Sequence, residues 1–227
     1  MTFRGIVLPT DFRHLHAAEW DVVDSVFGPT LPYRFRVFIS NGIGLYNTPF
    51  TVPTSVLSSA FIAAGIANPL LSVAGVGGLI SSPVRLALGV GAGYGASVVN
   101  AGFVMNVGPR YYANLLIDDY GTDTLVHEMT HVWQGKNGLL ALSSTLGALG
   151  AQCKGMSVSG GYAGRSSAYA YTITSPLAPW GGFNPEQQAK IVEDWYRFTK
   201  RGTPADLAEA KARFPYIGGY VRKGKTS

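Results

Sequence analysis

Charged residues are nearly absent from the middle of this 227-residue chain, which restricts its folding more than any other sequence feature. The 48 residues from Val37 to Val84 contain no Asp, Glu, Lys or Arg, and after Arg85 another 24 residues pass before Arg110. Small apolar side chains let helices pack closely, either in a protein core or in lipid. Three blocks here are rich in Ala, Gly, Leu and Val: Ser55–Ala67, Pro69–Ile80 and Leu86–Val99.

Two interpretations of these blocks stay open. Leu57–Ile80 reaches the roughly 20 residues that a membrane-spanning helix needs. However, Asn68, Pro69 and four glycines interrupt it, which favours a buried helical hairpin. We therefore expect an apolar helical insertion at about residues 55–102, with insertion into a membrane as the alternative.

The length of 227 residues fits one globular domain, and we expect residues 1–227 to form a single domain that carries this insertion. Charged residues make up only 14% of the chain, against roughly 25% in ordinary soluble domains. The net charge is +5, but the basic residues are scattered apart from Arg222, Lys223 and Lys225, so we expect no nucleic-acid partner. The single cysteine, Cys153, excludes an intrachain disulfide.

The sequence patterns predict strands and helices in the following places. Alternation predicts a half-buried strand over Tyr33–Ser40, whereas Pro49–Pro53 indicates irregular chain. Further strands are expected at Phe103–Val107, Tyr111–Tyr112 and Tyr169–Thr174. Helices are expected at Thr122–Gln134, capped by Thr122 or Asp123, at Gly138–Gln152, after the Asn184 capping box, and from Thr203–Pro204 to about Arg213.

The segment Thr124–Gln134, TLVHEMTHVWQ, contains a His-Glu-x-x-His motif. On a helix, His127 and His131 lie one turn apart on the same face, where they can bind one zinc ion. Glu128 lies about 100° around the helix, beside the open coordination position, where it can take a proton from the attacking water. The alternative is a pair of hydrogen-bonded histidines in a protein core.

A catalytic zinc site normally has three protein ligands. The metzincin continuation fails here, because Gln134 and Asn137 stand where that pattern needs Gly and the third His. No Asp or Glu occurs between Glu128 and Glu186, so elimination points to the helix over residues 186–194. Periodicity places Glu186 and Glu193 on one face of it and does not choose between them.

Three segments together resemble the metallopeptidase effector domains attached to VgrG and Rhs proteins of bacterial type VI secretion: TLVHEMTHVWQ, YAYTIT and FNPEQQAKIVEDWY. The resemblance is dense over residues 124–134 and 183–196 and thin elsewhere. It implies that His127 and His131 are zinc ligands, that Glu128 is the general base, and that Glu186 is the third ligand. The thermolysin-type aspartate four residues after the glutamate ligand is missing, because position 190 is Lys.

Hydrolysis also needs a donor aimed at the developing oxyanion. Tyr169 is our first candidate for this catalytic role and Tyr171 the second, with His14 and His16 behind them. Such tyrosines more often pack in a core.

These arguments predict an α+β, zincin-like fold, in which a small, mostly antiparallel sheet lies against the His127 helix and the C-terminal helices complete the site. The expected function is zinc-dependent peptide hydrolysis. The resemblance adds an antibacterial toxin, carried by a VgrG spike, neutralised by an immunity protein and acting in the target-cell periplasm. Since MTFRGIVLPTDFRHLH has no apolar signal core, we expect export without a signal peptide. The alternatives are a membrane-active toxin and a zinc-stabilised, non-catalytic binding module.

Overall fold

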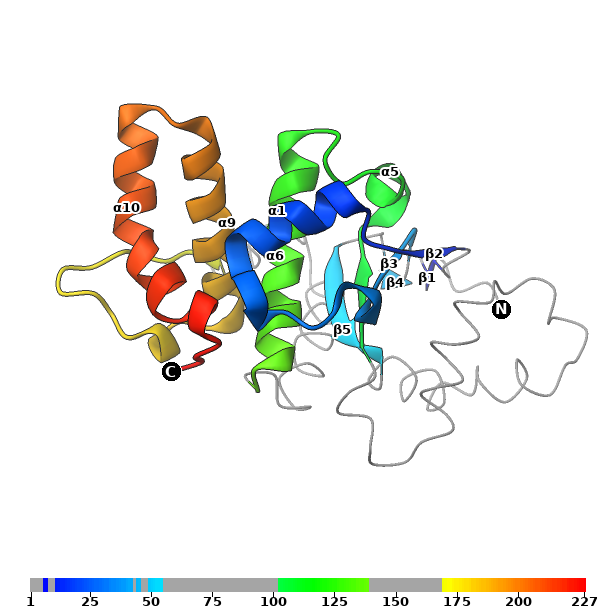
Figure 1. Cartoon of the computed structure of the whole chain (residues 1–227), viewed down its shortest axis with the longest axis horizontal. Helices are drawn as coiled ribbons and strands as arrows, with labels where there is room; N and C mark the ends of the chain where they lie inside the picture. Colours follow the sequence, from blue (N-terminus) through cyan, green and yellow to red (C-terminus); the bar gives the residue numbers. More distant parts are fainter. Residues whose placement is uncertain (1–5, 8–10, 43, 46–48, 55–101, 139–168) are drawn as a thin grey trace, which may run out of the picture. The chain divides into compact units, whose positions relative to one another are not determined.

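The computed structural model describes residues 6–7, 11–42, 44–45, 49–54, 102–138 and 169–227. These residues belong to two compact units, one formed by 1–15 and 33–114 and the other by 16–32 and 115–227. The described part of the first unit holds strands and short helices, and that of the second is helical (Figure 1), so the α+β class is confirmed. The single-domain organisation stays a prediction. The apolar blocks within 55–101 and the segments predicted over 139–168 lie outside the described residues.

The first unit contains a four-stranded sheet in the order β2-β3-β6-β5. Strand β2 (Phe12–His14) pairs antiparallel with β3 (Val37–Ser40), β3 pairs parallel with β6 (Phe103–Asn106), and β6 pairs antiparallel with β5 (Phe50–Pro53). The sheet is therefore mostly antiparallel, as expected. A second pair joins β1 (Ile6–Val7) to β4 (Gly44–Leu45), also antiparallel.

Three predictions about this unit are wrong in part. The strand expected from Tyr33 begins only at Val37, because Arg34–Arg36 forms a 3-10 turn (η2) that leaves Tyr33 and Phe35 stacked on each other, 71% and 61% exposed.

Residues 50–53 form a strand in spite of Pro53, since β5 is at the sheet edge, where a missing N–H is tolerated. The third error concerns Tyr111 and Tyr112, which lie in helix α5 (Gly108–Tyr112) instead of a strand. Pro109 in its first turn is the signal that favours the helix.

The second unit is built from four α-helices among its described residues: α1 (Ala17–Phe27), α6 (Asp119–Lys136), α9 (Pro185–Arg201) and α10 (Pro204–Gly219). Helix α9 packs against both α6 and α10, and α1 packs against α6. Figure 1 shows α9 and α10 as a helical hairpin. Short 3-10 turns complete the unit at Gly28–Thr30 (η1), Trp180–Gly182 (η5) and Val221–Lys223 (η6).

The local sequence explains where α9 and α10 begin and end. The Asn184 side chain accepts a hydrogen bond from the Gln187 amide at 2.9 Å, and the Gln187 side chain accepts one from the Asn184 amide at 3.0 Å, which is the predicted capping box. The apolar stripe of α9 is buried at Ile191, Val192 and Trp195. Gly202 has a φ of 68°, a conformation that glycine adopts without strain, and Thr203 caps the next helix.

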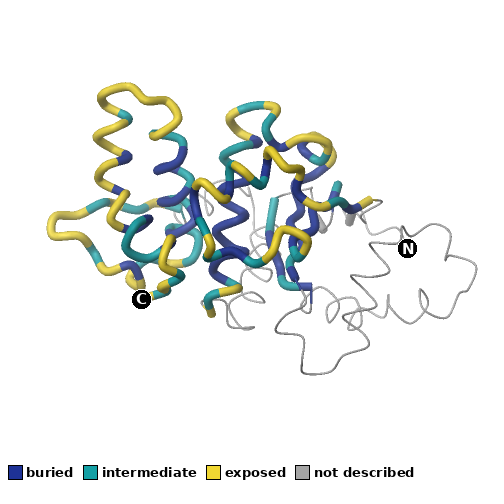
Figure 2. Tube along the Cα trace, viewed as in Figure 1, coloured by how far each residue is buried: buried dark blue, intermediate teal, exposed yellow. Residues whose placement is uncertain are grey.

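Aromatic side chains fill the core between these helices. Trp180 is fully buried and lies 5.6 Å from Tyr216 and 6.4 Å from both Trp133 and Phe183, measured between ring centroids. The Trp133 indole donates a hydrogen bond to the Val221 carbonyl at 3.0 Å. Figure 2 shows that α6 is buried through most of its length, whereas the end of α9 and the start of α10 are exposed.

In the second unit the structure corrects two predicted helix boundaries and one predicted strand. Helix α6 begins at Asp119, one turn before the expected start, because the Asp118 side chain caps it by accepting a 2.7 Å hydrogen bond from the Gly121 amide. Helix α10 continues through Pro215 to Gly219, where the buried Tyr216 and Ile217 hold its last turns in the core.

The third correction concerns the strand predicted over Tyr169–Thr174. Residues 170–174 have no regular structure, and the alternation that suggested a strand reflects contacts with α9 and α10.

Among the described residues, we find no helix with both the length and the apolarity that a membrane crossing requires.

Candidate metal centre

Helix α6 supplies both histidines of the predicted site. His127 and His131 lie one turn apart on this helix, and their rings are 5.1 Å apart between centroids with an interplanar angle of 79°. Both residues are buried. The i, i+4 spacing therefore does bring the two imidazoles together on one face, as the sequence predicts.

Helix α9 supplies the carboxylate. The Asn184 cap and Pro185 begin the helix just before Glu186, which fixes Glu186 in its first turn. One oxygen of Glu186, Oε2, lies 3.2 Å from Nε2 of His127 and 3.4 Å from Nε2 of His131. A ligand atom from each of the three residues lies within 4.8 Å of the others, a grouping that could hold a metal ion.

The charges in this cluster are strongly coupled. Burial alone would lower the pKa of His127, but its hydrogen bonds to Glu186 and Glu193 outweigh burial and raise that pKa to about 10. The pKa of His131 is also raised, because the negative charge of Glu186 outweighs burial. Conversely, burial favours the neutral form of Glu186, yet the two histidines hold its pKa well below the usual range. The carboxylates therefore favour the charged form of both imidazoles, and the imidazoles favour the ionised form of Glu186.

Glu128 follows His127 directly on α6 and is only 4% exposed. Its negative charge raises the pKa of both His127 and His131, so the carboxylate lies within electrostatic range of both rings. The residue predicted to act as a base is thus buried beside the candidate ligands.

Glu193 contacts the same histidine from the other side. Its Oε2 lies 3.0 Å from Nδ1 of His127, the ring nitrogen that does not contact Glu186. Periodicity had left Glu186 and Glu193 open as the third ligand. Of these two carboxylates, Glu186 is the one that lies close to Nε2 of both histidines, whereas Glu193 contacts Nδ1 of His127.

His131 has a partner that the sequence analysis missed. Its Nδ1 lies 2.8 Å from Oε1 of Gln134, whose Nε2 donates to the Pro185 carbonyl at 2.9 Å and to Gln188 Oε1 at 3.0 Å. Because the Gln134 amide group donates through nitrogen, its oxygen is the acceptor, so Nδ1 of His131 carries a proton toward Gln134 and Nε2 is the nitrogen that faces Glu186. The i, i+3 spacing from His131 was the available signal.

The predicted oxyanion donors fall in different places. The Tyr169 ring lies 5.6 Å from the His127 ring. The Tyr171 hydroxyl donates to Asp194 and accepts from Nε of Arg213, both at 2.7 Å, so it is committed elsewhere. His14 is on β2 in the other unit, where its Nδ1 lies 3.2 Å from the Val37 carbonyl oxygen, and His16 is the N-cap of α1. Tyr169 therefore remains the candidate.

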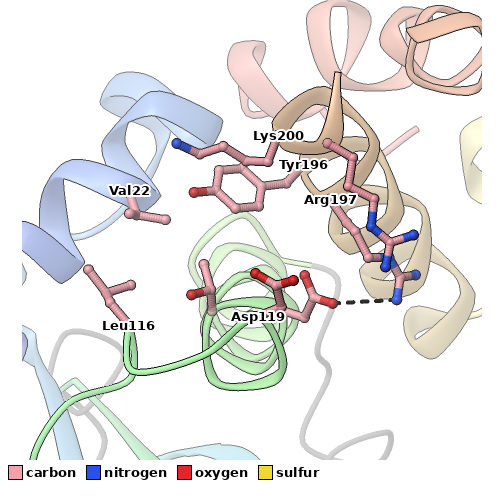
Figure 3. A pocket seen from close by; sticks show the side chains of 9 residues that line it. Val22, Leu116, Asp119, Tyr196, Arg197 and Lys200 are labelled. Atoms are coloured by element: carbon pink, nitrogen blue, oxygen red, sulfur yellow. Dashed lines mark hydrogen bonds and ion pairs between the residues drawn. The ribbon is translucent and has the colours of Figure 1, made fainter. Parts of the chain in front are cut away.

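An open cavity of about 470 Å³ lies on this helical unit, between α1, α6 and α9 (Figure 3). None of the three candidate ligands lines it, so it is distinct from the candidate metal centre. In its wall, Arg197 lies 3.4 Å from Asp123 Oδ2. Burial raises the pKa of Asp123 to about 6, although the charge of Arg197 opposes this shift. The cavity is lined by Val22, Leu116, Asp119, Thr122, Asp123, Tyr196, Arg197, Lys200 and Arg201.

No protein-family model, characterised protein or solved structure matches this chain in the three comparisons made with it.

Proposed function

We propose that this chain is a zinc-dependent hydrolase of peptide bonds, in which His127, His131 and Glu186 hold the metal. The observation that carries the proposal is the convergence of two imidazole Nε2 atoms on one carboxylate oxygen, at 3.2 and 3.4 Å. A buried second carboxylate, Glu128, accompanies them.

The donor set fits zinc. Two imidazoles and one carboxylate form a common ligand set of catalytic zinc sites, which keep the fourth position for water or substrate. Two ligand atoms about 2.1 Å from a tetrahedral ion lie about 3.4 Å from each other. The separations between Glu186 Oε2 and the two Nε2 atoms, 3.2 and 3.4 Å, are close to that value.

The chain's own residues then have separate roles. Zinc bound here would supply a Lewis acid that lowers the pKa of water toward about 7. Glu128 accepts the proton of the attacking water and returns it to the leaving amine, which is general base and then general acid catalysis. Tyr169, beside His127, donates a hydrogen bond to the oxyanion that develops on the substrate carbonyl.

The biological setting of the proposal depends on the resemblance to type VI effector domains. In that setting the chain is a zincin-type toxin, delivered by a VgrG spike to the periplasm of a target bacterium, and an immunity protein protects the producer. Directing the chain to the periplasm of a bacterial host tests this setting, since growth should stop for the unmodified chain and continue for Glu128→Gln.

The central experiment combines metal content with hydrolysis. The purified full chain should bind about one zinc and cleave peptides from a mixed library, and Glu128→Gln should keep the zinc while hydrolysis falls at least about 100-fold. Glu209→Gln, which removes an exposed carboxylate paired with Arg213, is the matched control and should retain full activity.

Two results would contradict the proposal. Zinc binding without cleavage of any peptide would favour the non-catalytic binding module. Toxicity that survives Glu128→Gln would favour a membrane-active toxin.

A further inference from the structure

Glu193 makes the contact on which this inference depends. It follows Glu186 by seven residues on α9, two helical turns or about 10.5 Å along the axis, so both side chains project from nearly the same face. The His127 ring lies across the gap between them, with Nε2 toward Glu186 and Nδ1 toward Glu193 at 3.0 Å. The Glu193 side chain is only 13% exposed.

Neighbouring cations hold the Glu193 carboxylate in place. Its Oε1 accepts a hydrogen bond from Lys190 at 2.5 Å and lies 3.6 Å from Arg197, so Oε2 alone faces His127. Arg197 is itself paired with Asp123 at 3.4 Å and with Asp194. Each oxygen of Glu193 therefore has its own partner.

The chemistry of imidazole gives this contact a consequence. A histidine that donates Nδ1–H to a carboxylate is fixed in one tautomer and one ring orientation, and its Nε2 becomes a stronger donor to a metal. Nδ1 of His131 instead faces a neutral amide oxygen, Oε1 of Gln134 at 2.8 Å. The two histidines thus differ, and His127 has the charged partner.

We propose that Glu193 is a positioning residue for His127, orienting its ring and strengthening Nε2 toward the metal. This inference rests on the zinc function proposed above. Lys190 occupies the position where the thermolysin pattern has an aspartate. Lys190 donates a hydrogen bond to Glu193, one turn farther along α9, and in this proposal Glu193 orients the histidine in place of that aspartate. Glu193 touches the ring nitrogen opposite the metal side, so it is not itself a ligand.

The first test measures the zinc affinity of the full chain by competition with a chromophoric chelator. Glu193→Gln keeps the size of the side chain and removes its charge, and zinc should bind about 10- to 100-fold more weakly. The visible absorption spectrum of the cobalt(II)-loaded variant should also differ from that of the unmodified chain, because the donor strength of His127 changes.

Asp194→Asn is the matched control. Asp194 contacts the same Lys190, at 3.0 Å, and the same Arg197, but no contact links it to the His127 ring. Its zinc affinity should stay within about threefold of the unmodified chain. An equal loss in both variants would overturn the inference, because the charged network would then act only through general stability. A Glu193→Gln affinity within threefold of the unmodified chain would overturn it as well.

A second measurement needs no variant. Long-range proton–nitrogen NMR of the zinc-loaded, unmodified chain should show a proton on Nδ1 of His127 and the metal on Nε2. Metal on Nδ1, or binding by the Glu193 carboxylate, refutes the positioning role. If the unmodified chain binds no zinc, the proposed function fails and this inference fails with it. Zinc binding with an unaffected Glu193→Gln variant refutes the inference alone.

Discussion

Zinc binding to this chain should release protons at neutral pH. In the metal-free cluster the hydrogen bonds to Glu186 and Glu193 raise the pKa of His127 to about 10, so this imidazole is charged at pH 7. The negative charge of Glu186 also raises the pKa of His131. The pKa values of Glu186 and Glu193 are lowered, so these carboxylates are already ionised. A metal needs neutral imidazole, so His127 must lose a proton when zinc binds, and any His131 that is charged must lose one as well.

The size of the effect follows from the His127 pKa. At pH 7 a group with a pKa of about 10 is neutral in about one molecule in a thousand, which costs metal binding about 4 kcal/mol. The apparent zinc dissociation constant should therefore fall about tenfold for each pH unit between 7 and 10 from His127 alone.

The same shift affects the stability of the metal-free chain. The pKa of His127 in the folded chain lies above the unfolded value of 6.5, so the contribution of His127 to the free energy of unfolding is fully present below about pH 6.5. It is lost as the pH rises through about 10.

Titration calorimetry tests the prediction directly. Zinc is titrated into the metal-free chain at pH 7 in buffers with different ionisation enthalpies, and the slope of the observed enthalpy against the buffer enthalpy gives the protons released. We expect between one and two protons per zinc. A slope of zero at a stoichiometry of one zinc per chain would refute the reasoning, because the imidazoles would then be neutral before the metal arrives.

Three further outcomes are expected. Burial raises the pKa of Asp123 to about 6, so the free energy of unfolding of the unmodified chain should fall as the pH rises from about 4 to 6. Urea unfolding should show Asp123→Asn to be more stable than the unmodified chain by roughly 1–3 kcal/mol at pH 7 and no more stable at pH 3.5. Trp180→Ala should lose about 3–5 kcal/mol by the same assay, since the side chain is fully buried among aromatic rings. Asn184→Ala removes a cap and should lose about 1 kcal/mol, and because it also loosens the helix start at Glu186, zinc affinity should fall too.

Local sequence signals predicted the parts of the site that depend on one helix. The i, i+4 spacing of His127 and His131 needs only a helix to bring the rings together, and the Asn184 capping box identified the start of α9 to the residue. Both signals act within a few residues, so no knowledge of tertiary structure is required.

Predictions failed where tertiary contacts override local patterns. The alternation from Tyr169 to Thr174 was attributed to a sheet, but Tyr171 instead bonds to Asp194 on α9 and Arg213 on α10. The alternation beginning at Tyr33 failed because a 3-10 turn leaves that aromatic ring exposed. A two-residue period indicates which side chains are in contact with the rest of the protein, but it does not indicate whether a strand or a helix provides that contact.

The separate contacts of Glu186 and Glu193 show the limit of periodicity at the site itself. Seven residues apart, they share a face of α9, so the sequence treats them as equivalent. What separates them is the His127 ring on α6, whose two nitrogens face different carboxylates: Nε2 faces Glu186 and Nδ1 faces Glu193. The distinction between a candidate ligand and a positioning residue therefore depends on how α6 and α9 pack, a property of two helices that the pattern of either one cannot contain. Lys190 and Arg197 reinforce this difference between the two glutamates, because they contact one oxygen of Glu193 and leave its other oxygen for His127.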